Sequence, residues 1–127
     1  MGDPITIGYG QNKWVKDANT KIVTLAQISP AGTAQTLPNV ETGAAYTVPV
    51  GKKYTVLVVT FGNIGGSSYI TFVGPTGLDI LKTKTSSTYP NVMEFITYVV
   101  FAAGTQPKGY TASGSGSIAC WGVEEDA

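Results

Sequence analysis

The amino-acid sequence predicts an all-β protein: an antiparallel β-sandwich or barrel of about eight strands that follows an extended N-terminal segment. Three observations predict this class. Helical periodicity is missing almost everywhere, and Pro or Gly interrupts nearly every stretch of ten residues. The remaining runs are rich in β-branched and aromatic residues that alternate with period two, as strands do.

The N-terminal segment differs from the rest of the chain. Residues 1–19 mix Gly, Asn and Lys with isolated aromatic side chains, Tyr9 and Trp14. A segment this poor in apolar residues cannot form a core of its own, so its aromatic side chains pack on this domain or on a neighbouring subunit. We expect an extended arm that binds a partner, with an ordinary edge strand as the alternative. The predicted division is an N-terminal arm, 1–19, and a β-sandwich domain, 20–127.

Two long runs give the strongest strand signals. Lys53–Phe61 is largely apolar on both of its alternating faces, which predicts a central strand without saying which face points inward. Val92–Phe101 is the second, with one charge, Glu94, near its end. Weaker strands are predicted at Thr20–Gln27, Ala45–Val48, Ser68–Val73, Leu78–Lys82, Gly109–Ala112 and Ser117–Glu124.

Turn residues separate these runs. Pro49-Val50-Gly51 fits a type I turn, with Pro at the second position and Gly at the fourth. Residues 62–66 (GNIGG) tolerate positive φ and predict a turn between two strands. Residues 113–116 (SGSG) form a flexible connector before the last strand.

The predicted core combines the apolar positions of these strands. We expect most of the buried set among Val56, Leu57, Val58, Val59, Phe61, Ile70, Phe72, Phe95, Ile96, Val99, Phe101, Ile118 and Cys120.

Charge excludes several classes of partner. Charged residues make up 13% of the chain, against about 25% in an average domain, and the formal net charge is zero. A neutral surface gives no electrostatic footprint for nucleic acid or for an anionic membrane. Because solubility favours a net charge away from zero, we expect a homo-oligomer whose surface is largely covered by partners.

Residue types that carry chemistry are scarce. The chain has no His and no Arg, and its one Cys, Cys120, lies in a predicted strand as a buried, inert thiol. Glu94 and Glu124 are the one acid pair that we place on neighbouring strands, and nothing marks them as catalytic. We therefore predict no enzyme activity, no catalytic residues, no cofactor and no metal site.

Aromatic side chains suggest a different class of site. The candidates for exposure are Tyr9, Trp14, Tyr46, Tyr69, Tyr89, Tyr110 and Trp121. Tyr89 and Tyr110 fall in or beside predicted loops, where an aromatic face is able to contact a glycan. The alternative is that the strand aromatics pack in the core or against cross-strand neighbours.

Three segments together resemble a known group of domains. They are Ala45–Val59 (AYTVPVGKKYTVLVV), Phe101–Gly109 (FAAGTQPKG) and Gly116–Glu125 (GSIACWGVEE). Their turns and closing strand are similar to small jelly-roll domains of bacteriophage and archaeal-virus particles, such as head decoration proteins, spikes and tail-tip domains. The resemblance covers about the last eighty residues and implies a jelly-roll sandwich, a homotrimer and an N-terminal segment that attaches it.

The expected function follows from the resemblance and from the missing chemistry. We expect a non-enzymatic virion structural protein, a capsid decoration or spike subunit that binds neighbouring subunits and a major capsid or other virion protein. The first residues carry no signal-peptide pattern, so we expect synthesis in the host cytoplasm and residence in the virion. The alternatives are a carbohydrate-binding or adhesin module at an extracellular surface, and a surface-filament subunit that donates its N-terminal strand to a neighbour.

Overall fold

A computed structural model describes residues 20–28, 32–65, 68–85, 92–111 and 115–127. The predicted arm, 1–19, lies outside this part of the chain. The strands are β1 (Lys21–Ile28), β2 (Gln35–Thr36), β3 (Lys52–Gly65), β4 (Ser68–Val73), β5 (Asp79–Thr85), β6 (Val92–Ala102), β7 (Lys108–Thr111) and β8 (Ser115–Asp126).

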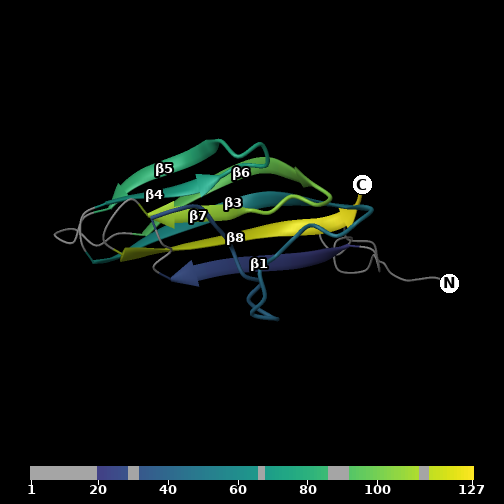
Figure 1. Cartoon of the computed structure of the whole chain (residues 1–127), viewed down its shortest axis with the longest axis horizontal. Coiled ribbons are helices and arrows are strands. Elements are labelled where there is room, and N and C mark those ends of the chain that lie inside the picture. Colours follow the sequence, from purple (N-terminus) through teal and green to yellow (C-terminus); the bar gives the residue numbers. More distant parts are fainter. Residues whose placement is uncertain (1–19, 29–31, 66–67, 86–91, 112–114) are drawn as a thin grey trace, which may run out of the picture.

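The strands form two four-stranded antiparallel sheets, ordered β1-β8-β3-β6 and β2-β7-β4-β5 (Figure 1). The pairing is nested: β1 pairs with β8, β2 with β7, β3 with β6, and β4 with β5. This order is that of one long hairpin that has been rolled up. Successive strand pairs of the hairpin then belong to the two sheets in turn, and this arrangement is the jelly roll. The fold prediction is confirmed.

Most strand predictions lie within a residue or two of the observed bounds, but Ala45–Val48 is wrong as a strand. Its alternation is real, because Tyr46 and Val48 are buried while Ala45 and Thr47 are exposed. The backbone nevertheless joins no ladder beyond one isolated bridge, between Pro38 and Ala45. The second strand is instead β2, two residues inside a stretch that looked like a loop.

Two turn predictions also need correction. The amide of Lys52 donates to the carbonyl of Pro49 at 3.1 Å, and Gly51 has a φ of 79°. The turn therefore spans Pro49–Lys52, with the positive φ at its third position that type II requires and type I lacks. Residues 62–65 are not a turn, because they extend β3 and pair with the start of β8.

A β-bulge in β3 decides which of its two apolar faces points inward. The register with both β6 and β8 shifts between Val56 and Val58. Tyr54 and Val56 are buried before the shift, and Val59 and Phe61 are buried after it. An extra residue reverses the alternation of a strand, so neither of the period-two sets predicted for β3 is the inner face.

The core lies between the sheets and includes eight of the predicted residues: Val56, Val59, Phe61, Ile70, Phe72, Phe101, Ile118 and Cys120. Phe95 and Val99 are partly buried against it. Ile96 is a wrong prediction, because 87% of its surface is exposed on the outside of β6. The core also includes residues that the prediction missed: Val23, Leu25, Leu37, Tyr46, Val48 and Tyr54.

Aromatic rings join the two sheets. Phe72 of β4 and Phe101 of β6 form an edge-to-face pair with centroids 6.0 Å apart, and Tyr46 and Tyr54 form another at 5.0 Å. The ring of Tyr54 lies over Gly122 of β8, where an added Cβ would be 2.6 Å from ring atoms. Gly at this position leaves room for the ring inside the sandwich.

We predict that the irregular segment between β2 and β3 contributes to stability as strongly as the strands do. Leu37→Ala should lower the free energy of unfolding by about 2–5 kcal/mol, since Leu37 is fully buried. Leu78→Ala removes the same atoms from a side chain that is 68% exposed. This variant should change the free energy of unfolding by about 0.5 kcal/mol or less. Chemical denaturation measures both, and equal effects would contradict the placement of Leu37.

Candidate functional site

The outer face of the β2-β7-β4-β5 sheet is polar. Tyr110 of β7 donates its hydroxyl hydrogen bond to Oδ2 of Asp79 at 2.7 Å. Lys82 of β5 places its Nζ 5.0 Å from the centre of the Tyr69 ring, a cation–π contact. Polar residues are the usual composition of a sheet face that meets water.

The outer face of the β1-β8-β3-β6 sheet is different. We call it the apolar outer face and define it by Ile22 of β1, Trp121 of β8, Val58 of β3, and Ile96, Tyr98 and Val100 of β6. The register places Val58 beside both Trp121 and Ile96, so the face is continuous across three neighbouring strands. The exposed fractions are 87% for Ile96, 76% for Tyr98, 54% for Ile22, 41% for Val100 and 39% for Trp121.

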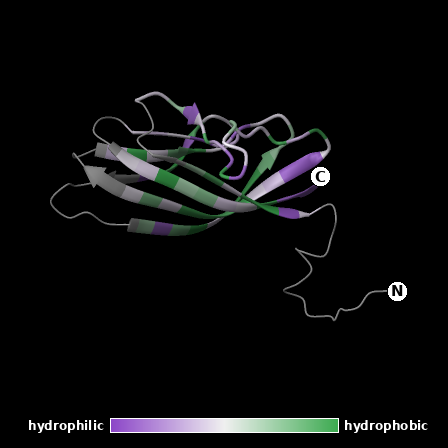
Figure 2. Ribbon diagram, turned by 90° about the horizontal axis from the view of Figure 1, so that it is seen from below, coloured by the Kyte–Doolittle hydropathy of each residue, from purple (hydrophilic) through white to green (hydrophobic). Residues whose placement is uncertain are grey.

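Charges lie only at the margins of this face among the described residues. At one end, Lys53 of β3 is the register partner of Glu125 of β8, so two opposite charges are adjacent. At the other end, Glu94 is the register partner of Thr60, beyond Ile96. Hydropathy along the ribbon shows green and pale bands that alternate along the strands of the sandwich (Figure 2). The centre of the face therefore offers a partner apolar contact and almost no charge.

A buried polar cluster lies inside the sandwich. The hydroxyl of Tyr46 donates a 2.8 Å hydrogen bond to Oε1 of Glu124, and Lys21 lies 3.7 Å from Oε2 of the same carboxylate. The hydroxyl of Tyr54 donates to the carbonyl oxygen of Val23 at 2.8 Å. These contacts satisfy polar groups that burial would otherwise leave without partners, so the cluster stabilises the fold.

The protonation of this cluster does not favour nucleophilic chemistry. Burial raises the pKa of the Cys120 thiol to about 12. Burial, and then the hydrogen bond to Glu124, raises the pKa of Tyr46 well above its usual range, and burial does the same for Tyr54. An activated Cys or Tyr requires a lowered pKa, so these groups remain protonated and inert. The prediction that Cys120 is buried is confirmed.

The prediction that Glu94 and Glu124 lie on neighbouring strands is wrong. Glu94 lies on β6 and Glu124 on β8, and β3 separates these two strands. Glu94 is exposed on the outside of the sheet, whereas Glu124 is buried. In the part of the chain that the structure describes, no group of three or more Cys, Asp or Glu side chains is placed to hold a metal ion. The same residues include no helix long and apolar enough to cross a membrane.

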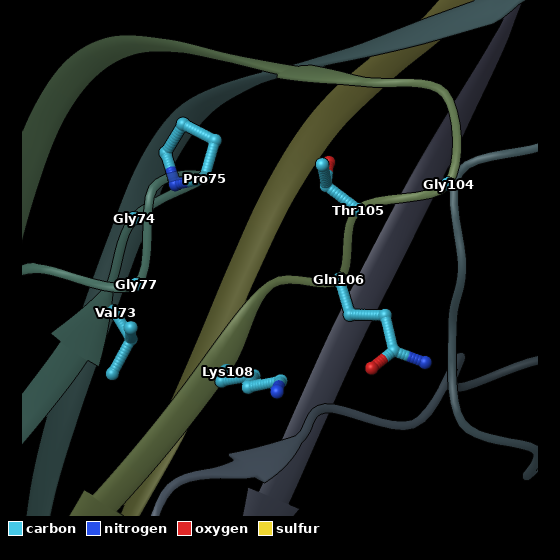
Figure 3. Close-up of a pocket in the computed structure, with 8 residues that line it drawn as sticks. All are labelled: Val73, Gly74, Pro75, Gly77, Gly104, Thr105, Gln106 and Lys108. Atoms are coloured by element: carbon cyan, nitrogen blue, oxygen red, sulfur yellow. The ribbon is translucent and has the colours of Figure 1, made fainter.

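A pocket of about 280 Å³ lies between the β4–β5 turn and the β6–β7 turn (Figure 3). Val73, Gly74, Pro75 and Gly77 line one side. Gly104, Thr105, Gln106 and Lys108 line the other. Gln106 is already engaged, since its Nε2 donates to Thr47 at 2.8 Å and its Oε1 accepts from Thr36 at 2.9 Å. The pocket walls are mostly turn backbone, and Lys108 is their one charged side chain.

The predicted site residues are only partly described. Tyr9, Trp14 and Tyr89 lie outside the described residues, so partner binding and glycan contact by them stay predictions. Tyr110 lies in β7 with its hydroxyl on Asp79, and glycan contact by it also stays a prediction. Tyr46, a candidate for exposure, is buried. Ile96, predicted in the core, and Tyr98, not predicted as a site residue, lie on the outer face, and the apolar character of both faces of the long strands is the signal for them.

No protein-family model and no curated protein matches this chain. Among solved structures, a virus-like particle of the extra small virus of the giant freshwater prawn Macrobrachium rosenbergii is similar, at 13% identity, over 100% of this chain and 94% of that chain, with a TM-score of 0.43. A cyanophage capsid asymmetric unit is 17% identical over 99% and 94%, with a TM-score of 0.42. Pilus-forming Bacillus endospore appendages are 13% identical over 87% and 94%, with a TM-score of 0.39. With TM-scores this low, the jelly-roll assignment rests on the strand order.

We predict that the Tyr46 hydroxyl stabilises the fold through Glu124. Tyr46→Phe leaves a buried carboxylate with one fewer donor and should lower the free energy of unfolding by about 1–3 kcal/mol. Tyr98→Phe makes the same change on an exposed side chain and should have an effect within about 0.5 kcal/mol. Denaturant titrations of the two variants make the comparison, and a neutral Tyr46→Phe would contradict it.

We also predict a loss of stability at alkaline pH. Burial raises the pKa of Cys120 from an ordinary 9.0 to about 12, so above about pH 9 the unfolded chain loses this proton more readily than the folded one. The contribution of Cys120 to the free energy of unfolding is therefore complete below about pH 9 and declines above it. The free energy of unfolding should fall by up to about 1.4 kcal/mol per pH unit from this one group. Cys120→Ala should reduce the slope between pH 9 and 10 in denaturation experiments. An unchanged slope would show that the thiol does not titrate in this way.

Proposed function

We propose that this chain is a non-enzymatic structural protein of a virus particle, a capsid decoration or spike subunit that binds neighbouring subunits and a major capsid or other virion protein. The observation that carries the proposal is the apolar outer face of the β1-β8-β3-β6 sheet. A fold alone does not determine a function, so the function of this protein depends on what this surface is able to bind.

The apolar outer face favours an assembled form of the protein over a monomer that is free in solution. A sheet face that meets water normally carries polar residues, as the other sheet of this protein does. Five of the side chains that define the face, all but Val58, together expose roughly 600 Å², which is at the upper end of the largest patch on a typical monomer. Patches of this kind mark binding surfaces, and an assembled shell or spike buries them.

The interior supports a structural role as well. Jelly rolls serve viral capsids, lectins and cupins, and the last of these hold their ligands inside the sandwich. Here large side chains fill the interior, among them Phe61, Phe72 and Phe101, each with 1% or less of its surface exposed. The buried hydroxyls of Tyr46 and Tyr54 are paired with Glu124 and with backbone, so these groups contribute stability and leave binding to the surface.

The proposed attachment uses the N-terminal arm, residues 1–19, through Tyr9 and Trp14. An arm of this length, at about 3.3 Å for each extended residue, is able to reach about 60 Å and so extends beyond its own domain. We propose a trimer as the assembled form and synthesis in the host cytoplasm before incorporation into the virion.

A filament subunit is the second candidate, and one observation favours it. The outer edge of β6 pairs with no other strand in the described residues, and the strand is long and carries a single charge, Glu94. Such an edge is a template for an added strand from a neighbour. Electron microscopy of the purified protein distinguishes the two candidates. Fibres would favour the filament subunit, whereas closed rings or trimers would favour the decoration subunit.

Mass spectrometry of purified particles tests the proposed function. We predict that the chain is a stoichiometric particle component, and its absence from the particle would refute the proposal. Deletion of residues 1–19 should reduce attachment to the particle and leave the circular dichroism of the β-fold unchanged. The double variant Tyr9→Ala/Trp14→Ala serves as the finer test, because it keeps the length of the arm. Full attachment of both variants would contradict the role of the arm.

A further inference from the structure

We infer that a second copy of this chain covers the apolar outer face, so that the outer side of the β1-β8-β3-β6 sheet is an interface between identical subunits. The inference rests on the proposed function in one respect, the assembly of several copies. It adds the surface at which the copies meet and the side chains that form the contact, with Ile96 and Tyr98 of β6 at its centre.

Most of this face is exposed in the described residues, whereas Val123 and Thr55, which the register places between Ile22 and Val100, are buried. The second sheet packs on its opposite side, where Val56, Val59 and Phe101 are buried. On the outer side, Ile96 and Tyr98 are the two most exposed large apolar side chains of β6. A large apolar side chain is more stable when buried than in water, so an assembled state that buries several of them is favoured.

The chemistry of the face points to an apolar and uncharged occupant. Its centre presents hydrocarbon and ring surface from Val58, Ile96 and Trp121 without a cation for phosphate or an acid for a basic partner. A glycan would find few hydrogen-bonding groups there. The chain itself has a net charge of zero, with eight basic and eight acidic residues, so two copies approach without net repulsion.

The marginal charges are also compatible with a second copy. Lys53 and Glu125 are register partners of opposite charge at one end, and Glu94 lies at the other end. The single excess charge lies beyond the apolar centre, where it is able to stay in contact with water. A second copy therefore buries hydrophobic area without desolvating an unpaired charge.

The size and shape of the face are those of a subunit contact. A stable interface buries about 800 Å² on each partner, and the exposed apolar side chains already supply most of this area. A twisted four-stranded sheet is complementary to another such sheet, as the two sheets inside this molecule show. The same packing repeated on the outer side would give a layered assembly of sheets.

The test compares the mass of the purified full-length chain in solution with that of surface variants. Ile96→Lys and Tyr98→Lys each place an ammonium group in the middle of the face, where a second copy would have to desolvate it. We expect the unaltered chain to be oligomeric at micromolar concentration by multi-angle light scattering, and each variant to raise the dissociation constant at least about 100-fold.

Val50→Lys and Leu78→Lys are matched controls, because both side chains are strongly exposed but neither belongs to the apolar outer face. Both controls should remain oligomeric, and circular dichroism should show the same β-fold in all four variants. A monomeric unaltered chain, or oligomers that persist in both face variants, would overturn the inference. Oligomers lost only on deletion of residues 1–19 would also overturn it, and would identify the arm as the occupant.

The outcomes separate this inference from the proposed function. Face variants that become monomeric, in a protein absent from purified particles, would support the subunit interface and refute the virion role. Face variants of a monomeric chain that fail only to attach to particles would do the opposite, and would assign the face to another virion protein.

Discussion

The position of β3 constrains most of the structure around it. It is hydrogen-bonded along both edges, to β6 and to β8, so it cannot shift without breaking two ladders. Its inner face supplies Tyr54, Val56, Val59 and Phe61 to the core. The bulge between Val56 and Val58 is compatible with both ladders and changes the alternation of the strand at that point. The inner core and the outer binding face are thus two sides of one strand, and the bulge determines how residues are divided between them.

Much of the fold is readable from local patterns. Runs of β-branched and aromatic residues locate β1, β3, β4, β6 and β8 closely, because the alternation of side chains is a property of a strand by itself. The alternation at Tyr46 and Val48 matches their burial, because the two side chains that share a face both point inward, although the predicted core did not include them. A ladder, however, needs a partner strand, and no local pattern shows whether a partner is present.

The candidate site was predictable only indirectly. The apolar character of both faces of residues 53–61 and 92–101 requires cover on both sides, and the described residues supply an opposing sheet on one side. That signal led to the expectation of a central strand, which holds for β3, whereas β6 lies at the edge of its sheet. The pairing of Tyr46 with Glu124 was out of reach, since 78 residues separate them and only the three-dimensional fold brings them together.

The nested pairing has a consequence for biosynthesis. Among the eight strands β1 pairs with β8 alone, and the bridge from Leu25 to Asn39 lies outside the strands, so Val23 and Leu25 have no sheet to join until about a hundred further residues are made. At about 5–20 residues per second, that interval lasts on the order of 5–20 seconds. Throughout it the apolar residues of β1 and β3 are open to other nascent chains on the same polysome. Slower translation lengthens this exposure, so translation rate and chaperone supply, as well as the stability of the finished domain, affect the yield of folded protein.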